Sequence, residues 1–317
     1  MAEQARRYEA DVAWLVARND RFVGSPCPVC SESRATPTWK KSGLTYVECA
    51  GCQTVYMRPR PSPELLSEYY SSSQNYEYWN NVVFPASEAA RRAKIFRPRA
   101  ERVAEISERY GNPGGTLLDV GAGYGTFCEE VVALGGFARV IALEPEPQLA
   151  ETCRSKGLEV VEAPVEQAEL DPADVITSFE VIEHLFSPRD LIQRCAGLLQ
   201  PGGLLVLTCP NVRGFDIVVM REGASAVDAE HLNYMHPGSL GKLLDDVGFD
   251  VVESSTPGRL DAELVRKRVL AGDFDLTRQP FLQQVLIDEW DRLGSAFQDF
   301  LASNELSSNM WLVGRRR

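Results

Sequence analysis

Short apolar runs alternate with longer helical stretches along the chain from about residue 87 onward. Each run has the length of a strand that is buried on both faces of a sheet, and the stretches between them carry helical periodicity. Strands and helices that alternate in this order predict a doubly wound α/β fold with a mostly parallel sheet. After a helix expected over 87–110, the runs lie at 116–120, 139–144, 158–162, 174–179, 203–209 and 250–254.

The N-terminal part of the chain follows a different pattern. Residues 1–24 contain an amphipathic helix that is expected to pack as an arm. Residues 25–61 consist of short apolar runs broken by proline, glycine and paired cysteines, which is typical of a small metal-held module. Residues 62–95 are expected to form a linker and helical cap, with a helix over 64–70 and then a loop rich in Tyr, Ser and Asn up to residue 81.

The C-terminal tail is less regular than the alternating region. Two helices are expected at 261–270 and 281–301, and a short strand at 309–313. These elements are assigned with the alternating region to one domain over 96–317.

Composition and net charge limit the kinds of protein that this sequence can form. At 317 residues, with 44% hydrophobic and 25% charged residues, the chain is long enough for about two folding units of ordinary globular composition. No stretch approaches the ~18 apolar residues that a spanning helix needs, and the start does not read as a signal peptide, so a cytoplasmic protein without membrane association is predicted. A net charge of −12 argues against nucleic acid as a partner.

The cysteines are unevenly distributed. Of the eight, four stand as two close pairs, C-P-V-C and C-A-G-C, and the other four are scattered. This spacing fits a tetrahedral zinc site built from thiolates, and a four-sulfur shell leaves no coordination position open for catalysis. We therefore expect a structural zinc ion; the alternative is four free core thiols. The expected ligands are Cys27, Cys30, Cys49 and Cys52.

A glycine turn follows the first strand of the alternating region. Its glycines stand as G-x-G-x-G at Gly121, Gly123 and Gly125, and such a turn lets backbone approach a ligand closely. A nicotinamide dinucleotide fingerprint would need Gly or Ala where Thr126 stands, which counts against an oxidoreductase. The next strand ends at Glu144, where a carboxylate can accept hydrogen bonds from both hydroxyls of a ribose. The alternative is a solvated strand-end carboxylate.

Ordered motifs give the sequence a family likeness. They read Leu118-Asp-Val-Gly-Ala-Gly-Tyr-Gly125, Ala142-Leu-Glu-Pro145, Asp174-Val-Ile-Thr-Ser-Phe-Glu-Val-Ile-Glu-His-Leu185 and Leu199-Gln-Pro-Gly-Gly-Leu-Leu-Val-Leu-Thr-Cys-Pro-Asn211. In this combination the sequence resembles class I S-adenosylmethionine (SAM)-dependent methyltransferases over about residues 96–255. The resemblance implies a Rossmann-like seven-stranded methyltransferase sheet, with a small N-terminal zinc-binding module and helical additions. Its last strand would return antiparallel between Val206 and Val251, which makes residues 256–308 a helical insertion near the substrate side.

The same resemblance implies which residues hold SAM. The glycine turn would line the methionine part, Asp119 would hold that turn or the amino group, and Glu144 would bind the ribose. The expected cofactor-binding residues are Asp119, Gly121, Ala122, Gly123, Gly125, Glu144, Pro145 and Phe179.

Two acids and a histidine follow the fourth strand, at Glu180, Glu183 and His184. This position lies at the topological switch point of the sheet, and such a group is suited to removing a proton from a nucleophile. The pattern resembles ubiquinone-pathway O-methyltransferases, which implies a divalent metal such as Mg²⁺ on these three residues, and sugar C-methyltransferases, which implies proton abstraction by the Glu-His pair. The alternative is that Glu183 and His184 only cap the helix beginning near Ser187.

Two further features are candidates for the acceptor side. His231 matches a histidine frequent in the same family and is expected to act as a second base or orienting group; the alternative is a histidine hydrogen-bonded to backbone. The aromatic segment from Tyr76 to Trp79 is a candidate wall of the acceptor pocket or a packing element.

These observations favour a SAM-dependent methyltransferase that modifies oxygen or carbon of a small-molecule acceptor, in natural-product biosynthesis or sugar modification. The sugar enzymes continue into a second α/β domain, whereas this chain stops about sixty residues after the sixth strand. Two alternatives stay open: a protein or RNA methyltransferase docked through the zinc module, and a SAM-binding protein without catalysis. The sequence does not indicate the acceptor or the oligomeric state.

Overall fold

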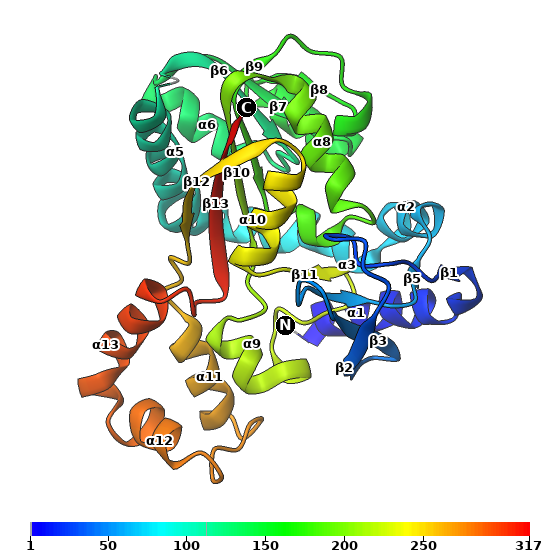
Figure 1. The fold of residues 1–317 in the computed structure, drawn as a ribbon, viewed down its shortest axis with the longest axis vertical. Helices are drawn as coiled ribbons and strands as arrows, with labels where there is room; N and C mark the ends of the chain where they lie inside the picture. Colours follow the sequence, from blue (N-terminus) through cyan, green and yellow to red (C-terminus); the bar gives the residue numbers. More distant parts are fainter. Residues whose placement is uncertain (1, 112) are drawn as a thin grey trace.

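The computed structural model describes residues 2–111 and 113–317, and its largest element is a seven-stranded sheet (Figure 1). The strand order is β12-β13-β10-β9-β6-β7-β8. All neighbouring pairs from β10 to β8 are parallel, whereas β13 runs antiparallel to both β10 and β12. This arrangement confirms the expected doubly wound sheet with a reversed last strand. The bounds are β6 Gly114–Val120, β7 Phe137–Leu143, β8 Glu159–Val161, β9 Ala173–Phe179, β10 Leu199–Pro210, β12 Phe249–Ser255 and β13 Asn309–Arg316.

Helices cover both faces of this sheet. Successive side chains of a strand point to opposite faces, so Leu117 packs into the core beneath α5 and α6, and Leu118 into the core beneath α8 and α10. This division explains why the central strands are almost wholly apolar. The covering helices are α5 Arg97–Tyr110, α6 Thr126–Leu134 and α7 Pro147–Ser155 on one face, and α8 Pro188–Leu198 and α10 Pro237–Asp246 on the other.

The cysteine-containing segment forms a second, four-stranded sheet in the order β11-β4-β3-β2. The edge strand β11 comes from the α/β part of the chain. It pairs with β4 through Asn233 with Tyr56 and Tyr234 with Val55. The proposed boundary near residue 61 therefore separates segments that share a sheet. The bounds are β2 Ala35–Lys41, β3 Leu44–Cys49, β4 Val55–Met57 and β11 Asn233–Tyr234, with α1 Ala2–Val16, η1 Asn19–Arg21, β1 Phe22–Val23 and β5 Arg60–Pro61 beside it.

The connection between this sheet and α5 is helical, and the loop expected up to residue 81 is wrong. The reason is a cap from a distant residue: the Asp11 carboxylate in α1 accepts hydrogen bonds from Ser73 Oγ (2.7 Å), the Gln74 amide (3.0 Å) and the Asn75 amide (2.8 Å). A carboxylate satisfies the free amides at a helix start and favours the positive end of its dipole. The elements are α2 Pro63–Ser72, α3 Gln74–Tyr78, η2 Trp79–Val83, α4 Phe84–Arg91 and η3 Arg92–Phe96.

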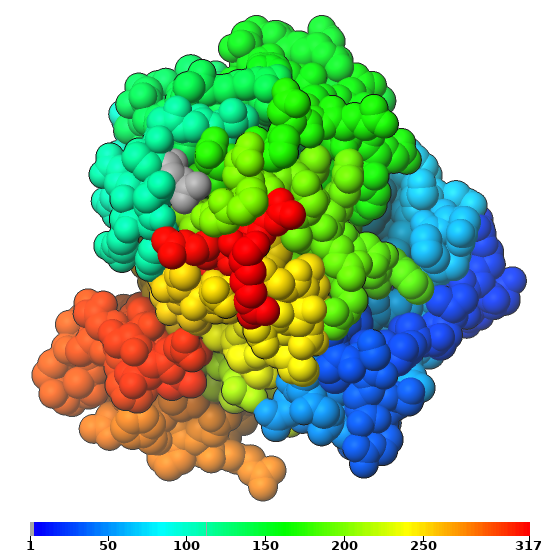
Figure 2. Space-filling model, turned by 45° about the horizontal axis from the view of Figure 1, so that its top comes forward, coloured from blue at the N-terminus to red at the C-terminus, as the bar shows by residue number. Residues whose placement is uncertain are grey.

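The expected helical insertion lies between β12 and β13 and projects from one end of the sheet (Figure 1). Figure 2 shows this lobe, in orange, and the N-terminal segments, in blue, on opposite sides of the molecule. The single helix expected over 281–301 is interrupted near Glu289. Within the two described ranges, no helix is long and apolar enough to cross a membrane. The remaining elements are α9 Phe215–Met220, α11 Asp261–Leu270, α12 Pro280–Gln283, α13 Trp290–Ser303, η4 Val165–Gln167, η5 Ile182–His184, η6 Arg221–Gly223 and η7 Gln284–Asp288.

Candidate active site

The glycine turn connects the carboxyl end of β6 to α6. Gly121 and Gly125 have φ angles of +79° and +68°, in the left-handed region that favours glycine. A Cβ atom would lie 2.7 Å from Val181 Cγ2 at Gly121 and 2.5 Å from Leu158 Cδ1 at Gly125. Protein side chains therefore pack closely against Gly121 and Gly125, whereas a Cβ atom at Gly123 would have nothing within 4 Å.

Two buried carboxylates lie beside this turn, and Glu144 is hydrogen-bonded to it. Asp119 accepts a hydrogen bond of 2.6 Å from Thr177 Oγ1, and burial raises its pKa to about 6. Glu144 accepts hydrogen bonds from the Gly123 amide (2.7 Å) and the Glu146 amide (3.0 Å), and burial raises its pKa to about 7. The strand-end carboxylate is therefore buried and bonded to the glycine turn, which counts against the solvated alternative.

The remaining expected cofactor residues surround this turn. Ala122 and Phe179 are half-buried, and Pro145 is exposed. The Phe179 ring contacts the Phe127 ring edge-on at 4.9 Å between centroids, and the Arg99 guanidinium lies 4.9 Å from its centroid.

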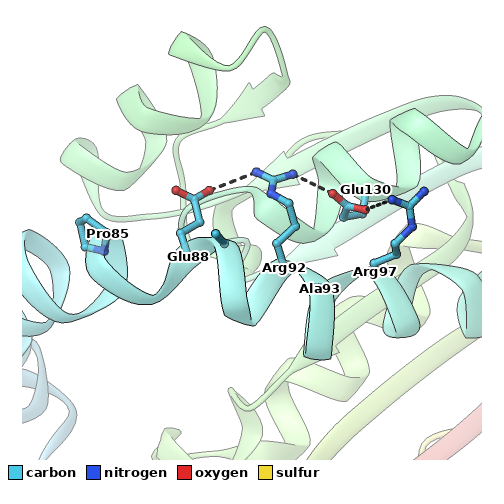
Figure 3. A pocket seen from close by; sticks show the side chains of 7 residues that line it. Pro85, Glu88, Arg92, Ala93, Arg97 and Glu130 are labelled. Atoms are coloured by element: carbon cyan, nitrogen blue, oxygen red, sulfur yellow. Dashed lines mark hydrogen bonds and ion pairs between the residues drawn. The ribbon is translucent and has the colours of Figure 1, made fainter.

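The α4 segment covers the glycine turn. The ring of Phe84 stacks on that of Tyr124 with centroids 3.7 Å apart, and the Tyr124 hydroxyl donates to the Asn80 carbonyl. Arg92 bridges Glu88 and Glu130, as Figure 3 shows, and also pairs with Glu129. A surface cavity of about 540 Å³ lies beside these groups, lined by Pro85, Glu88, Ala89, Arg92, Ala93, Arg97 and Glu130. The charged side chains that line the cavity pair with one another, and these ion pairs attach the α4 segment to α6.

Glu180 follows β9 but does not join Glu183. Its backbone is left-handed, with φ +56°, and its Oε1 accepts hydrogen bonds from Thr208 Oγ1 (2.7 Å) and Asn309 Nδ2 (3.0 Å). Arg99 Nη2 lies 3.1 Å from the same oxygen. These partners lie on β10, β13 and α5, so this oxygen is directed toward those elements.

Glu183, His184 and His231 form the cluster that the structure does bring together. One potential ligand atom from each residue lies within 4.8 Å of the others, and the imidazole centroids are 4.6 Å apart. His184 Nδ1 lies 3.1 Å from the Glu230 carbonyl and 3.2 Å from the Tyr70 hydroxyl, and His231 Nδ1 lies 2.8 Å from the Ala226 carbonyl. A carbonyl only accepts, so these contacts assign the proton of each neutral ring to Nδ1 and leave the Nε2 lone pair free.

Glu183 is the most unusual member of this cluster. Its side chain is 1% exposed, and among residues 2–111 and 113–317 no other residue donates a hydrogen bond to either carboxylate oxygen. Burial raises the pKa of Glu183 well above its ordinary value, whereas burial and then the neighbouring His231 lower the pKa of His184 to about 3. Because buried polar groups without partners are rare, these free oxygens point to a bound proton, cation or ligand. They also show that Glu183 does not cap the helix after Ser187.

Aromatic and acidic side chains from other elements complete the surroundings. Tyr70 contacts Tyr76 edge-on at 6.1 Å between centroids. Burial raises the pKa of Tyr76, and the nearby charges of Glu144 and Glu230 raise it further. Tyr76 therefore lies near both Glu144 and Glu230. The Glu230 carboxylate accepts from Tyr69 and Asn75. Sequence reasoning included Tyr76 but missed Tyr70 and Glu230, for which no local motif gives a signal.

The paired cysteines also meet as expected. Cys27 Sγ lies 3.5 Å from Cys52 Sγ, and Cys30 Sγ 3.4 Å from Cys49 Sγ, with all four sulfurs within 4.8 Å of one another. The Gly51 amide donates to Cys49 Sγ at 3.3 Å. Four close sulfurs with an amide donor fit a thiolate-bound zinc ion in donor set and number. The scattered cysteines Cys128, Cys153, Cys195 and Cys209 are buried elsewhere.

Part of the chain is similar in sequence to known methyltransferases. A family model described as "Methyltransferase domain" matches residues 90–254. The ubiquinone biosynthesis O-methyltransferase of Xanthomonas campestris pv. campestris (strain B100) is 34% identical over 119 residues, which cover 35% of this chain and 49% of that protein. The enzyme of the same name from Xanthomonas oryzae pv. oryzae (strain PXO99A) is 36% identical with the same coverage. The chain thus spans about half the length of these curated relatives.

The solved structures to which this chain is similar are more distant in sequence. The 1,6-didemethyltoxoflavin-N1-methyltransferase of Burkholderia thailandensis has a TM-score of 0.47 and 14% identity, covering 89% of this chain and 99% of that one. Phosphoethanolamine N-methyltransferase 2 of Haemonchus contortus has a TM-score of 0.47 and 16% identity, covering 68% of this chain and 52% of that one.

Proposed function

Because the chain belongs to the methyltransferase-domain family, whose model spans residues 90–254, we propose that it transfers the methyl group of SAM to oxygen or carbon of a small-molecule acceptor. The observation that carries this proposal is the cluster of Glu183, His184 and His231 next to the glycine turn. Both lie at the carboxyl ends of the adjacent parallel strands β6 and β9, where open α/β sheets bind their ligands. Specialised metabolism or sugar modification is the setting we propose for this reaction.

The glycine turn and Glu144 are the proposed SAM site. The backbone of the turn accepts close approach of the methionine part, and Glu144 is the proposed acceptor of ribose hydrogen bonds. Methyl transfer from a sulfonium needs the nucleophile aligned with the methyl carbon and sulfur, since the sulfonium carries its own leaving group. Tyr76, which contacts Tyr70 and lies near Glu144, is the proposed wall of the acceptor site.

The histidine cluster is the proposed site of proton removal. An oxygen or carbon acid becomes a strong nucleophile when its proton leaves, and a positioned base supplies this step. Glu183 has both oxygens available to accept that proton, and the Nδ1 contacts of His184 and His231 to backbone carbonyls leave the Nε2 atom of each ring as the acceptor. We do not give Glu180 this role in our proposal, because Arg99, Thr208 and Asn309 hold its Oε1 atom outside the histidine cluster.

A divalent metal on the same cluster is a second candidate, favoured by the free oxygens of Glu183. Glu183, His184 and His231 would hold it. The Nδ1 atoms of the two histidines contact backbone carbonyls, which is the usual outer support of histidine ligands. Two imidazoles and a carboxylate suit zinc or a similar transition metal better than magnesium, which prefers oxygen. When bound, such an ion would lower the pKa of an acceptor hydroxyl.

Metal analysis separates the two candidates without an activity assay. The protein is loaded with zinc, desalted and analysed for metal per chain. If the cluster binds metal, wild type holds one equivalent more than the His231→Ala variant, because the cysteine site is intact in both. Equal metal content in the two proteins leaves proton abstraction by Glu183 as the mechanism.

The activity itself is tested with methyl-labelled SAM and a cell extract split into small-molecule and macromolecular fractions. We expect label in the small-molecule fraction. Label confined to macromolecules supports the alternative in which the cysteine module docks a protein or RNA. Absence of label from every fraction, with SAM bound, supports a binding protein without catalysis.

The role of Glu183 is tested by Glu183→Gln, which keeps the shape of the side chain but removes its basicity. We expect methyl transfer to fall by about 10²-fold or more, the usual contribution of a general base, while the affinity for S-adenosylhomocysteine is unchanged. Glu253→Gln, which removes a carboxylate paired with Arg102 away from the cluster, is the control and should keep full activity. Unchanged transfer by Glu183→Gln would remove this residue from the mechanism.

A further inference from the structure

The turn that carries Glu183 and His184 is held by a single amide side chain. Asn233 is 1% exposed, and its Nδ2 lies 2.7 Å from the Leu185 carbonyl, 3.3 Å from the Glu183 carbonyl and 3.5 Å from the Ile182 carbonyl. The neighbouring Leu232 amide donates to the Glu183 carbonyl at 2.9 Å. The backbone of the catalytic turn is therefore fixed from the β11 side.

Arg60 in turn orients Asn233. Its Nη2 donates to Asn233 Oδ1 at 3.2 Å, which leaves the amide nitrogen facing the turn. The same guanidinium donates to the Phe186 carbonyl (2.9 Å) and the Met57 carbonyl (3.3 Å). Arg60 is 1% exposed and makes no ion pair among the described residues, so its charge is buried against neutral acceptors and the rings of Tyr56 and Phe186. Burying a guanidinium is costly unless its hydrogen bonds are made, and here three oxygen acceptors from separate segments make them.

Both residues connect the catalytic turn to the cysteine-containing sheet. Asn233 pairs with Tyr56 of β4, and the Met57 amide donates to the Leu232 carbonyl at 2.9 Å. Arg60 follows β4 by three residues. Contacts thus run from the strand beside the cysteine cluster, through Arg60 and Asn233, to the backbone of Glu183.

We infer that Arg60 and Asn233 are positioning residues, through which the cysteine module sets the geometry of the Glu183–His184 turn. This inference rests on the proposed function for its catalytic consequence. It gives the module a task inside the active site: β11 is a strand of the module's sheet and also the support of the catalytic turn. A module used only for docking a partner would not need either contact.

The test compares variants that remove these hydrogen bonds with one that loosens the module elsewhere. Asn233→Asp is isosteric but cannot donate to the three carbonyls, and Arg60→Met keeps the stem without the guanidinium. Arg60→Lys restores one donor group. The control is Arg189→Gln, because Arg189 Nη2 joins α8 to the Val29 carbonyl of the module at 2.7 Å without touching the turn.

The first readout is amide hydrogen exchange in residues 181–187 of the full chain, which needs no acceptor. We expect exchange there to be about tenfold faster in Asn233→Asp and Arg60→Met, intermediate in Arg60→Lys, and unchanged in Arg189→Gln. Affinity for S-adenosylhomocysteine, measured by calorimetry, should stay within about twofold in every variant, which shows that each has folded. Unchanged exchange in Asn233→Asp, or equal acceleration by Arg189→Gln, overturns the inference.

The second readout is the rate of methyl transfer to the small-molecule fraction that wild type labels. Displacing a catalytic group by about 1 Å can lower a rate by 10²-fold. We expect kcat to fall at least tenfold in Asn233→Asp and Arg60→Met with KM for SAM unchanged, and Arg60→Lys to recover part of the loss. A rise in KM for SAM with kcat retained contradicts a positioning role. If wild type labels nothing, the proposed function fails while the exchange experiment still decides this inference.

Discussion

At the scale of single residues, burial raises the pKa values of two carboxylates in the candidate site. Asp119 and Glu144 are buried carboxylates whose pKa values rise to about 6 and about 7 because water is excluded from them. Their hydrogen bonds to Thr177 and the Gly123 amide act in the opposite direction but do not cancel the effect of burial. The ionisation of Glu144 therefore changes within the physiological pH range, and so should the affinity of the site for a ribose.

The pH dependence of cofactor binding follows from this pKa. The ionised Glu144 carboxylate is the better acceptor for ribose hydroxyls, and with a pKa of about 7 its ionised fraction rises about tenfold between pH 6 and pH 8. We expect the affinity for S-adenosylhomocysteine, measured by calorimetry, to increase by up to about that factor over this range. Glu144→Gln should bind more weakly at pH 8 and show little change with pH. An equally steep pH dependence in Glu144→Gln would assign the effect to another group.

In the absence of ligand, the free energy of unfolding should fall as pH rises, whereas the affinity for S-adenosylhomocysteine should rise. The folded pKa of Glu144 lies above its ordinary value of 4.5, so the folded state holds more protons than the unfolded chain between about pH 4.5 and pH 7. The contribution of Glu144 to the unfolding free energy therefore decreases as pH rises through this window. Denaturant unfolding of wild type should show a fall that is smaller in Glu144→Gln; Asp119 adds a fall of the same sign at lower pH.

At the scale of elements, short helices and turns depend on residues distant in sequence. The five-residue α3 is too short to be stable alone, yet it carries Tyr76 into the site. Asp11 of α1 caps it, and the stacked Phe84 and Tyr124 rings attach the following helical segment to the glycine turn. The cover of the site is thus assembled from contacts between elements.

The cap is tested by Asp11→Ala. This change removes the acceptor of three hydrogen bonds at the start of α3, and helix-cap losses cost about 0.5–2 kcal/mol. We expect the free energy of unfolding, from denaturant titration, to fall by about 1–2 kcal/mol, with weaker acceptor binding through Tyr76. Glu9→Ala removes an exposed carboxylate of the same helix and should have little effect. A loss in Glu9→Ala as large as in Asp11→Ala would contradict the capping explanation.

At the scale of the whole molecule, the cysteine module and the α/β sheet form one unit. Cys27, Val29 and Tyr56 belong to the same hydrophobic core as helices α8 and α10, and His236 Nε2 contacts the Cys52 carbonyl at 2.9 Å. β11 belongs to the module's sheet and begins two residues after His231, so one short segment links the cysteine cluster to the histidine cluster. We therefore expect loss of a zinc ion from the cysteine cluster to lower both stability and methyl transfer.

The cysteine site is tested by Cys49→Ser. We expect this variant to hold one zinc equivalent less than wild type and to unfold at a lower temperature, because a structural metal contributes folding free energy. Cys195→Ser removes a buried thiol of α8 outside the cluster and should retain zinc. The measurements are metal analysis of freshly purified protein and thermal unfolding. Wild type with less than about half an equivalent of zinc would contradict the assignment.

Sequence alone determined the features that depend on local pattern. Strand-length apolar runs predicted the sheet, the glycine spacing predicted the turn after β6, and the paired cysteines predicted one cluster. In each case the deciding residues are close in sequence, so the physical preference for burial, for left-handed backbone or for tetrahedral thiolates can be read directly.

Only the tertiary structure decided which distant side chains meet. It joined His231 to His184 across forty-seven positions, turned Glu180 toward Arg99, and placed Asn233 and Arg60 against the turn that carries Glu183. It also made a helix of the expected loop, since its cap comes from Asp11. These outcomes depend on which faces pack together, and no periodicity along the chain encodes the partner of a polar side chain on another element.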